Sequence, residues 1–363
     1  MNYHDIGIES SNKDRIILNE SALLPRFSQD AYLSCRKADG ERVFAAIQRL
    51  STGESAQNLL IYGPSGSGKT AMAKWAINKM EEQTRRVLCI YANCWRYNTS
   101  MAIYAKIADA FGEPVSRRGR ASDEVFDRII ELMRESKKPI LLVLDQIDAL
   151  IRYDNGRILH NIASVDEDRV LFEVIGISEN ENALSRLPER TKEILGFAKI
   201  QVQSFSREEL LALVKERALV GLREGTYDDS VLEEIVDIGA AEKGSGRFAL
   251  QLLWRAARGS EDAGYASISK TEVEKIRQDL EFVEFDFSRE ERIILDLLKN
   301  GQITSSELYS QFWQRIPRGK RQIRNYLKQM EKNGYIEIEE FMGSTRFMSK
   351  KIKIREGFRW RRD

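Results

Sequence analysis

Between residues 59 and 200 the chain alternates short apolar runs with longer stretches in which apolar residues recur at helical spacing. The runs NLLIYG, RVLCIYAN, PILLVLD and VLFEVIGIS each fit one strand, and segments such as KTAMAKWAINKMEEQ fit the helices between them. Strands that are apolar throughout must be covered on both faces, as they are in a parallel sheet with helices on each side. The pattern therefore predicts an α/β domain built around a parallel sheet.

The first of these runs leads into GPSGSGKT, which matches the phosphate-loop pattern G-x-x-x-x-G-K-T. The motif lies between a strand and a helix, where glycines let backbone N–H groups turn onto phosphates and the helix N-terminus adds positive potential. Lys69 is expected to neutralise the β- and γ-phosphates of ATP or ADP, and the Thr70 hydroxyl to hold Mg²⁺. The predicted nucleotide-binding residues are Gly63, Pro64, Ser65, Gly66, Ser67, Gly68, Lys69, Thr70 and Ala71.

A second part of the same site is predicted in ILLVLDQIDAL, where an apolar strand ends in Asp145. Its carboxylate is expected to act on the metal side of the site, together with Thr70. The next residue is Gln146, where an ATP-hydrolysing enzyme would carry a glutamate that activates water. An amide can hydrogen-bond a water molecule but cannot accept its proton as a carboxylate does.

The chain changes character twice after the α/β segment. From about Ser204 the pattern is wholly helical, as in SREELLALVKERALVGL and GRFALQLLWRAARGSEDAG, and near Phe287 a third pattern begins. The predicted domains are a nucleotide-binding α/β domain over 1–203, a helical lid domain over 204–285 and a winged-helix domain over 286–363.

The composition favours a cytoplasmic protein. No run approaches the roughly 18 consecutive apolar residues of a membrane span, and the N-terminal MNYHDIGIESSNKDRI has no apolar segment of a secretory signal. The three cysteines have no metal-ligand spacing, and two histidines argue against a histidine-based zinc site or catalytic triad.

Residues 287 to 354 have the pattern of a winged helix. SREERIILDLLKNG, ITSSELYSQFWQRI and KRQIRNYLKQMEKNG fit three helices, with Ser288 as the expected cap of the first and Thr304 or Ser305 as that of the second. YIEIEEF and FMSKKIKIR fit a β-hairpin with MGSTR at its tip. The residues expected to contact DNA are Lys320, Arg321, Arg324, Asn325 and Lys328 on the third helix, and Ser344, Thr345 and Arg346 at the hairpin tip.

The charge of the chain supports a polyanionic partner for this module. From Phe287 to Asp363 there are 18 Lys and Arg against 10 Asp and Glu, a net charge of +8, so the preceding 286 residues carry −7 of the total +1. A basic module on a mildly acidic body favours double-stranded DNA as the ligand. Winged helices also serve as protein–protein modules, and that alternative stays open.

In its succession of motifs the chain resembles the archaeal replication initiators. These AAA+ proteins are similar to the large subunit of the eukaryotic origin recognition complex and to the cell-division-control helicase loader. The resemblance runs from about Leu18 to Ile354, and it rests on ANCWRYNTSMAIYAKIADAFGEPVSRRG, VIGISENENALSRLPERTKEIL and GSGRFALQLLWRAA besides the phosphate loop. It implies an initiator that recognises origin duplex DNA, helps to recruit or load the replicative helicase, and can contact other initiator protomers.

The resemblance also implies roles for single residues. Arg247, near the start of a lid helix, falls where the family has a sensor-2 arginine that contacts the γ-phosphate. Arg190 falls where the family has an arginine that can reach the nucleotide of a neighbouring protomer. Arg117, Arg118 and Arg120 fall where the family carries an insertion that touches DNA. Weaker candidates, where the family packs chain against the adenine base, are Leu24, Pro25 and Arg36.

Two positions depart from the family pattern. Gln146 replaces the family's glutamate, and Glu179 aligns with the family's polar sensor asparagine, which follows as Asn180 one place later. A missing general base typically costs about 10²–10⁴ in rate, and a carboxylate at position 179 would add negative charge near the γ-phosphate. The hypothesis is a protein that binds ATP or ADP and hydrolyses ATP slowly. An introduced rather than native Gln146 would have the same effect.

Two other functions are compatible with these residues. One is a nucleotide-regulated DNA-binding switch or transcription regulator with no part in helicase loading, which the two departures favour. The other is a transposition or defence-type AAA+ regulator, which usually lacks this order of lid and winged helix.

Overall fold

The computed structural model describes nine stretches of the chain: 15–24, 34–115, 121–165, 170–280, 289–299, 301–316, 319–332, 335–342 and 348–354. They belong to two compact units, Met1–Val273 and Glu274–Asp363. Within these stretches no helix is long and apolar enough to cross a membrane.

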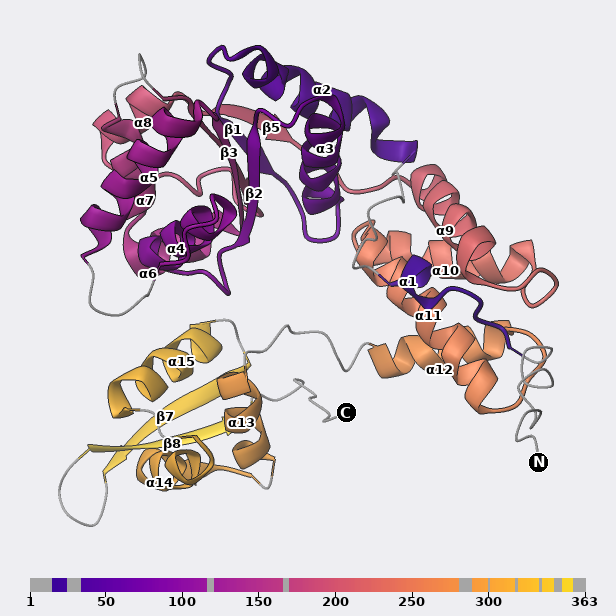
Figure 1. Ribbon diagram of the computed structural model, residues 1–363. Coiled ribbons are helices and arrows are strands. Elements are labelled where there is room, and N and C mark those ends of the chain that lie inside the picture. Colours follow the sequence, from indigo (N-terminus) through magenta and orange to yellow (C-terminus); the bar gives the residue numbers. More distant parts are fainter. Residues whose placement is uncertain are drawn as a thin grey trace, which may run out of the picture. The chain divides into compact units, whose positions relative to one another are not determined.

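A five-stranded sheet forms the centre of the first unit (Figure 1), and its strand order is β2-β3-β4-β1-β5. Every neighbouring pair of strands is parallel, as the sequence predicts. The strands are β1 (Leu59–Tyr62), β2 (Leu88–Asn93), β3 (Ile140–Asp145), β4 (Phe172–Ser178) and β5 (Ala198–Gln201).

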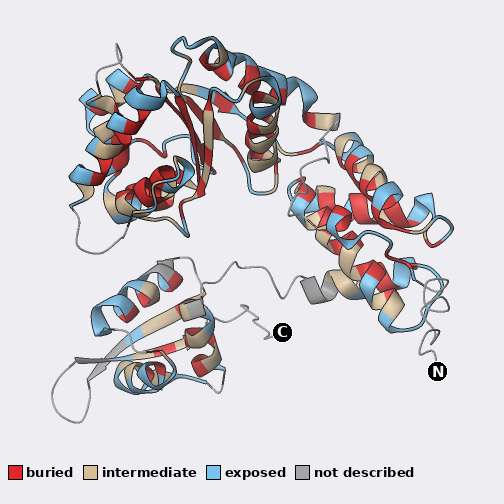
Figure 2. Cartoon of the chain, in the orientation of Figure 1, coloured by how far each residue is buried: buried red, intermediate tan, exposed pale blue. Residues whose placement is uncertain are grey.

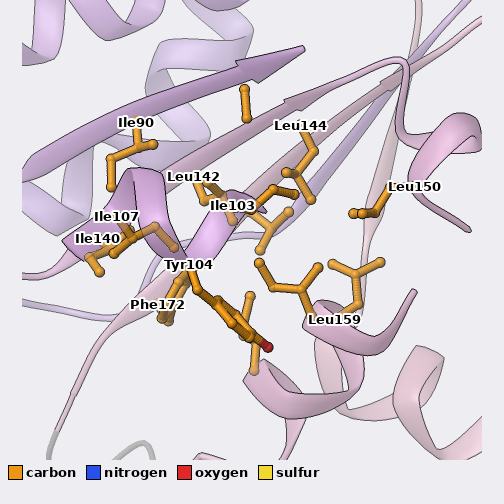
Figure 3. Close-up of a cluster of buried hydrophobic side chains, with 14 of the residues drawn as sticks. Ile90, Ile103, Tyr104, Ile107, Ile140, Leu142, Leu144, Leu150, Leu159 and Phe172 are labelled. Atoms are coloured by element: carbon orange, nitrogen blue, oxygen red, sulfur yellow. The ribbon is translucent and has the colours of Figure 1, made fainter. Parts of the chain in front are cut away.

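Helices cover both faces of this sheet. Leu141 and Val143 of β3 pack on one face, while Leu142 and Leu144 pack on the other, in the cluster of Figure 3. All four side chains are fully buried, and the strands stand out as buried in Figure 2. This two-sided cover explains why β3 is apolar throughout.

The helices of the two faces come from different parts of the chain. One face carries α2 (Lys37–Ile47), which the short turns η1 (Ser34–Arg36) and η2 (Gln48–Thr52) flank, and α3 (Lys69–Gln83). The other face carries α4 (Ser100–Ala110), α5 (Ser122–Ser136), α6 (Ile147–Asp154), α7 (Arg157–Ala163) and α8 (Glu189–Leu195).

The chain then forms the predicted helical lid. Its helices are α9 (Arg207–Gly221), α10 (Asp229–Ala241), α11 (Gly246–Asp262) and α12 (Lys270–Leu280). A capping box starts α9, because the Ser206 side chain accepts from the Glu209 backbone while the Glu209 side chain accepts from the Ser206 backbone.

The first described segment packs against the lid. Ile17 forms an antiparallel bridge with Leu222, and one Glu261 oxygen accepts the backbone N–H groups of Ile16 and Ile17, both at 2.7 Å. The short helix α1 (Glu20–Leu23) follows. The lid thus includes a segment from the start of the chain. The predicted boundaries place this segment in the first domain, over 1–203, and those boundaries stay predictions.

The second unit has the winged-helix arrangement of three helices and a three-stranded antiparallel sheet, in the order β6-β8-β7. Its core contains Ile294, Phe312 and Ile352. The elements are α13 (Arg289–Leu298), β6 (Ile303–Thr304), α14 (Ser305–Arg315), α15 (Lys320–Lys332), β7 (Ile336–Met342) and β8 (Met348–Ile354).

Local details of this unit follow the sequence pattern closely. Thr304 caps α14 through a capping box with Glu307, and Ile323, Leu327 and Met330 of α15 are buried. Ile323, Tyr326, Leu327 and Met330 follow helical spacing, which predicts that all four belong to the core, but Tyr326 is only half-buried at the core's edge. The expected cap Ser288 lies outside the described residues.

Candidate nucleotide-binding site

The phosphate loop connects β1 to α3, and its glycines adopt left-handed backbone conformations. Gly63 has φ of 151°, and Gly68, which precedes the first turn of α3, has φ of 95°. A Cβ atom at Gly63 would overlap the carbonyl oxygen of Val202, which follows β5. Glycine is therefore needed at position 63 both for its backbone conformation and for the closeness of the neighbouring chain.

The Lys69 side chain lies inside this loop. Its ammonium donates to the carbonyl oxygens of Gly63 at 2.7 Å and Pro64 at 2.6 Å, and the residue is only 8% exposed. Burial lowers the pKa of Lys69, and the charges of Glu179 and Asp145 oppose that shift. The lysine is thus held at the loop by groups that a phosphate could replace as partners.

Asp145 stands at the carboxyl end of β3 and is nearly buried. One of its oxygens, Oδ2, accepts from the Thr70 hydroxyl at 2.9 Å and from the Tyr91 hydroxyl at 2.6 Å. Burial raises the pKa of Tyr91, and the Asp145 charge raises it further, so the phenol stays a donor.

This donor set suits Mg²⁺. A hydroxyl and a carboxylate oxygen in direct contact are hard oxygen ligands, and Mg²⁺ commonly takes one or two protein oxygens together with phosphates and water. No group of three or more His, Cys, Asp or Glu residues is placed to hold a metal in the described part of the chain. The residues fit a metal that is completed by a bound nucleotide, with Thr70 and Asp145 as its protein partners.

Gln146 follows Asp145 in a left-handed conformation, with φ of 58°. Gln146 lines a cavity between the phosphate loop and the lid, which we call the pocket. Its Oε1 accepts from Asn93 Nδ2 at 3.4 Å. Glu179 also lines the pocket and is exposed. Its neighbour Ser178 donates to Asp148 at 2.7 Å.

The lid supplies the other wall of a cavity of about 130 Å³. Arg247, the second residue of α11, lines it, and the neighbouring Gly246 N–H donates to the Gly66 carbonyl at 3.2 Å. Arg217 of α9 lines it as well and is 4% exposed. Burial lowers the pKa of this arginine. The apolar part of the lining consists of Ile177, Phe205, Leu213 and Leu250.

Comparisons with known proteins identify the domains and the fold. A model of the AAA domain matches residues 51–187, and a model of the Cdc6 AAA+ ATPase-type lid domain matches residues 211–278. The ORC1-type DNA replication protein 1 of Sulfurisphaera tokodaii is 28% identical over 277 residues, which are 76% of this chain and 69% of the relative. The chain thus matches an AAA domain followed by a Cdc6-type AAA+ lid domain, and it is similar to ORC1-type DNA replication proteins.

Other relatives and solved structures match a larger share of the chain. The ORC1-type DNA replication protein 9 of Halobacterium salinarum is 27% identical over 84% of this chain and 86% of its own length. The structure of the Aeropyrum pernix ORC1 protein in complex with DNA has a TM-score of 0.74 at 22% identity, covering 93% of this chain and 94% of that one. The A. pernix ORC2 structure with ADPNP and ADP has a TM-score of 0.67 at 22% identity, covering 94% and 95%. These likenesses show that the chain has the fold of those structures.

Several predicted site residues lie outside the pocket. Arg190 is exposed on α8 and does not line it. Arg36 stacks at 4.2 Å on the ring of Phe205, a pocket residue, and donates to the Gln203 carbonyl. Leu24 is half-buried next to α1. Pro25 lies outside the described residues.

The predicted DNA contacts divide into two groups. On α15, Lys320, Arg321, Arg324, Asn325 and Lys328 are all exposed, on the side of the helix away from its core residues. The other predicted DNA contacts lie outside the described part of the chain and stay predictions. They are Arg117, Arg118, Arg120, Ser344, Thr345 and Arg346.

Four polar residues in or next to the nucleotide pocket were not predicted from the sequence: Tyr91, Asn93, Asp148 and Arg217. Tyr91 and Asn93 lie in β2, which pairs with β3 so that Asn93 faces Asp145. Their role depends on strand order, which the apolar runs do not encode. The signal for Asp148 was present, because DQID places a second carboxylate in the first turn of α6.

We predict that Tyr91→Phe weakens the Mg²⁺ dependence of nucleotide binding. Without the Tyr91 hydroxyl, Asp145 Oδ2 loses the shorter of its two hydrogen bonds. Loss of such an orienting partner typically costs about 10–100-fold in metal affinity. Binding of a fluorescent ATP analogue should then require correspondingly more Mg²⁺ for half-saturation, while binding in EDTA is unchanged. Tyr97→Phe, which removes a hydroxyl from the next tyrosine along the chain, is the control. An unaltered Mg²⁺ requirement in Tyr91→Phe would show that Tyr91 does not orient Asp145.

Proposed function

We propose that this protein is an ATP- or ADP-binding replication initiator that recognises origin duplex DNA and helps to recruit or load the replicative helicase. The Cdc6-type lid match and the similarity to ORC1-type DNA replication proteins support the initiator class, and the A. pernix ORC1 protein has been solved in complex with DNA. In this chain the observation that carries the proposal is a nucleotide pocket combined with a winged helix that exposes a basic α15.

The pocket has the groups needed to bind a triphosphate with Mg²⁺. Lys69 would exchange its loop carbonyls for phosphate oxygens, while backbone N–H groups at the start of α3 face the same anion. Thr70 and Asp145 would hold the metal, which neutralises phosphate charge when bound. Arg247 would approach the γ-phosphate from the lid, so the nucleotide would bridge the phosphate loop and α11.

Hydrolysis is proposed to be slow in the same pocket. Gln146 cannot act as a general base, and its amide oxygen already accepts from Asn93. Glu179 brings a negative charge to the pocket that Lys69 and Arg247 also line. Bound nucleotide would therefore persist and hold the lid against the phosphate loop. The protein would act in the cytoplasm, where the chromosome is.

We predict that Gln146→Glu raises the single-turnover rate of ATP hydrolysis by about 10²–10⁴-fold, because it restores a general base. The unchanged protein should hydrolyse far more slowly than 1 per second. Gln146→Ala, which removes the amide without adding a carboxylate, should show no gain. Wild-type turnover of order 1 per second would contradict the proposed slow hydrolysis.

We predict that Arg324→Ala with Lys328→Ala weakens binding to duplex DNA of every sequence. Each lost phosphate contact should reduce the slope of log affinity against log salt by about 1. Arg315→Ala on α14, where Arg315 pairs with Asp296 at 3.5 Å, is the control for loss of a cation from the same unit. An equal decrease in the salt slope for both would contradict a DNA-facing α15.

A nucleotide-regulated transcription regulator is the second candidate, because Gln146 and Glu179 weaken the case for an ATP-driven loading cycle.

For an initiator, we predict that the protein occupies the chromosome only at origins and binds the cognate replicative helicase directly. Chromatin immunoprecipitation and a pull-down with purified helicase test these outcomes. Occupancy spread over promoters, without helicase binding, would favour the regulator.

A further inference from the structure

The loop after β4 places a carboxylate beside the phosphate loop. Strands β1 and β4 are parallel neighbours, and their last paired residues are Tyr62 and Ser178. The residues that come next are Gly63, at the start of the phosphate loop, and Glu179. The Gly63 carbonyl accepts from the Lys69 ammonium at 2.7 Å. Since parallel strands end at one edge of the sheet, Glu179 lies next to the start of this loop, and it lines the pocket.

Hydrogen bonds hold the backbone on both sides of Glu179. The Ser178 hydroxyl donates to Asp148 at 2.7 Å and accepts from the Asn180 N–H at 2.8 Å. The Asn180 side-chain oxygen in turn accepts from the Asn182 N–H at 2.9 Å. Ser178 itself is buried at the end of β4. The backbone of Glu179 therefore has a fixed place at the pocket, so its carboxylate can move only by turning the side chain.

The Glu179 carboxylate has no hydrogen bond or ion pair with the residues that the structure describes. Asp145, by contrast, accepts from the Thr70 and Tyr91 hydroxyls. The Glu179 charge is nevertheless felt at Lys69. Burial lowers the pKa of Lys69, and the charge of Glu179 opposes that shift more strongly than the charge of Asp145 does. The negative charge of Glu179 therefore acts on whatever binds at Lys69.

The charges that line the pocket favour a ligand with few phosphates. The cations are Lys69, Arg217 and Arg247, and the carboxylates are Asp145 and Glu179. Asp145 is expected to hold Mg²⁺, so Glu179 is the carboxylate that would face phosphate without a metal between them. Backbone N–H groups of a phosphate loop hold the α- and β-phosphates, and its lysine reaches the β- and γ-phosphates. A carboxylate beside the lysine and outside the loop therefore opposes the γ-phosphate most.

We propose that Glu179 makes this pocket selective for a nucleoside diphosphate over the triphosphate. The inference rests on the nucleotide binding proposed above, and it names ADP as the nucleotide that the pocket retains. In the ADP complex, Glu179 would be the negative neighbour of Lys69 and Arg247 where the third phosphate is missing. In the ATP complex, the carboxylate and the γ-phosphate would repel each other and weaken binding. Glu179 is thus a specificity-determining residue.

The test measures the dissociation constants of ADP and of the β,γ-imido analogue of ATP, each with Mg²⁺, by titration calorimetry. Wild type should bind ADP about 10-fold more tightly than the analogue, because like charges a few ångströms apart near a protein surface repel by about that factor. Glu179→Gln keeps the shape without the charge and should remove most of this preference. Glu179→Asp keeps the charge and should keep the preference. Added salt should reduce the wild-type preference, since it screens exposed charges.

Glu181→Gln is the matched control. Glu181 carries the same charge in the same loop, but it pairs with Lys199 at 3.0 Å and does not line the pocket. The control should therefore keep the wild-type ratio of the two dissociation constants. Equal affinity of wild type for both nucleotides, or an unaltered ratio in Glu179→Gln, would overturn the inference and leave the proposed nucleotide binding intact. Failure of wild type to bind either nucleotide would overturn both.

Discussion

The site depends on the parallel pairing of β3, β4 and β1, because parallel strands bring their carboxyl ends to one edge of the sheet. The phosphate loop leaves that edge after Tyr62, Asp145 ends β3 there, and Ser178 ends β4 opposite Tyr62. Apolar packing on both faces fixes the strands, so it also fixes the polar groups at their ends. The burial that stabilises the sheet therefore sets the positions of Thr70 and Asp145 relative to one another.

The lid forms the part of the pocket that lies opposite the sheet edge. The Gly246 N–H donates to the Gly66 carbonyl, so α11 starts directly on the phosphate loop and brings Arg247 to the pocket. Arg217 enters from α9, and its Nη1 donates to the Ala22 carbonyl at 3.4 Å. One arginine of the pocket is thus tied to the segment from the start of the chain. A ligand that displaced Arg217 would act on that segment as well as on the lid.

The parts of this structure that sequence could predict are those encoded locally. The continuous apolar run before Asp145 indicates a buried parallel strand, and the glycines before Lys69 indicate a phosphate loop, because each pattern has a direct physical cause within a few residues. Tyr91 could not be found this way, since its contact with Asp145 arises only from the adjacency of β2 and β3. Arg217 resembled any cation on an amphipathic helix, and its burial depends on a segment nearly 200 residues earlier in the chain.

In the function that we propose, binding and hydrolysis rest on different groups in this pocket, so one could be weakened without the other. The phosphate-binding groups belong to the loop before α3, whereas the residue that would activate water follows β3. Asn93 connects the second position to the surface, because its amide donates to Gln146 while its oxygen accepts from the Trp95 N–H. A single side chain thus contacts both the floor of the nucleotide pocket and the loop that presents Trp95. A nucleotide that shifted Gln146 would have to break or carry along that amide, so Asn93 links the pocket to the loop after β2.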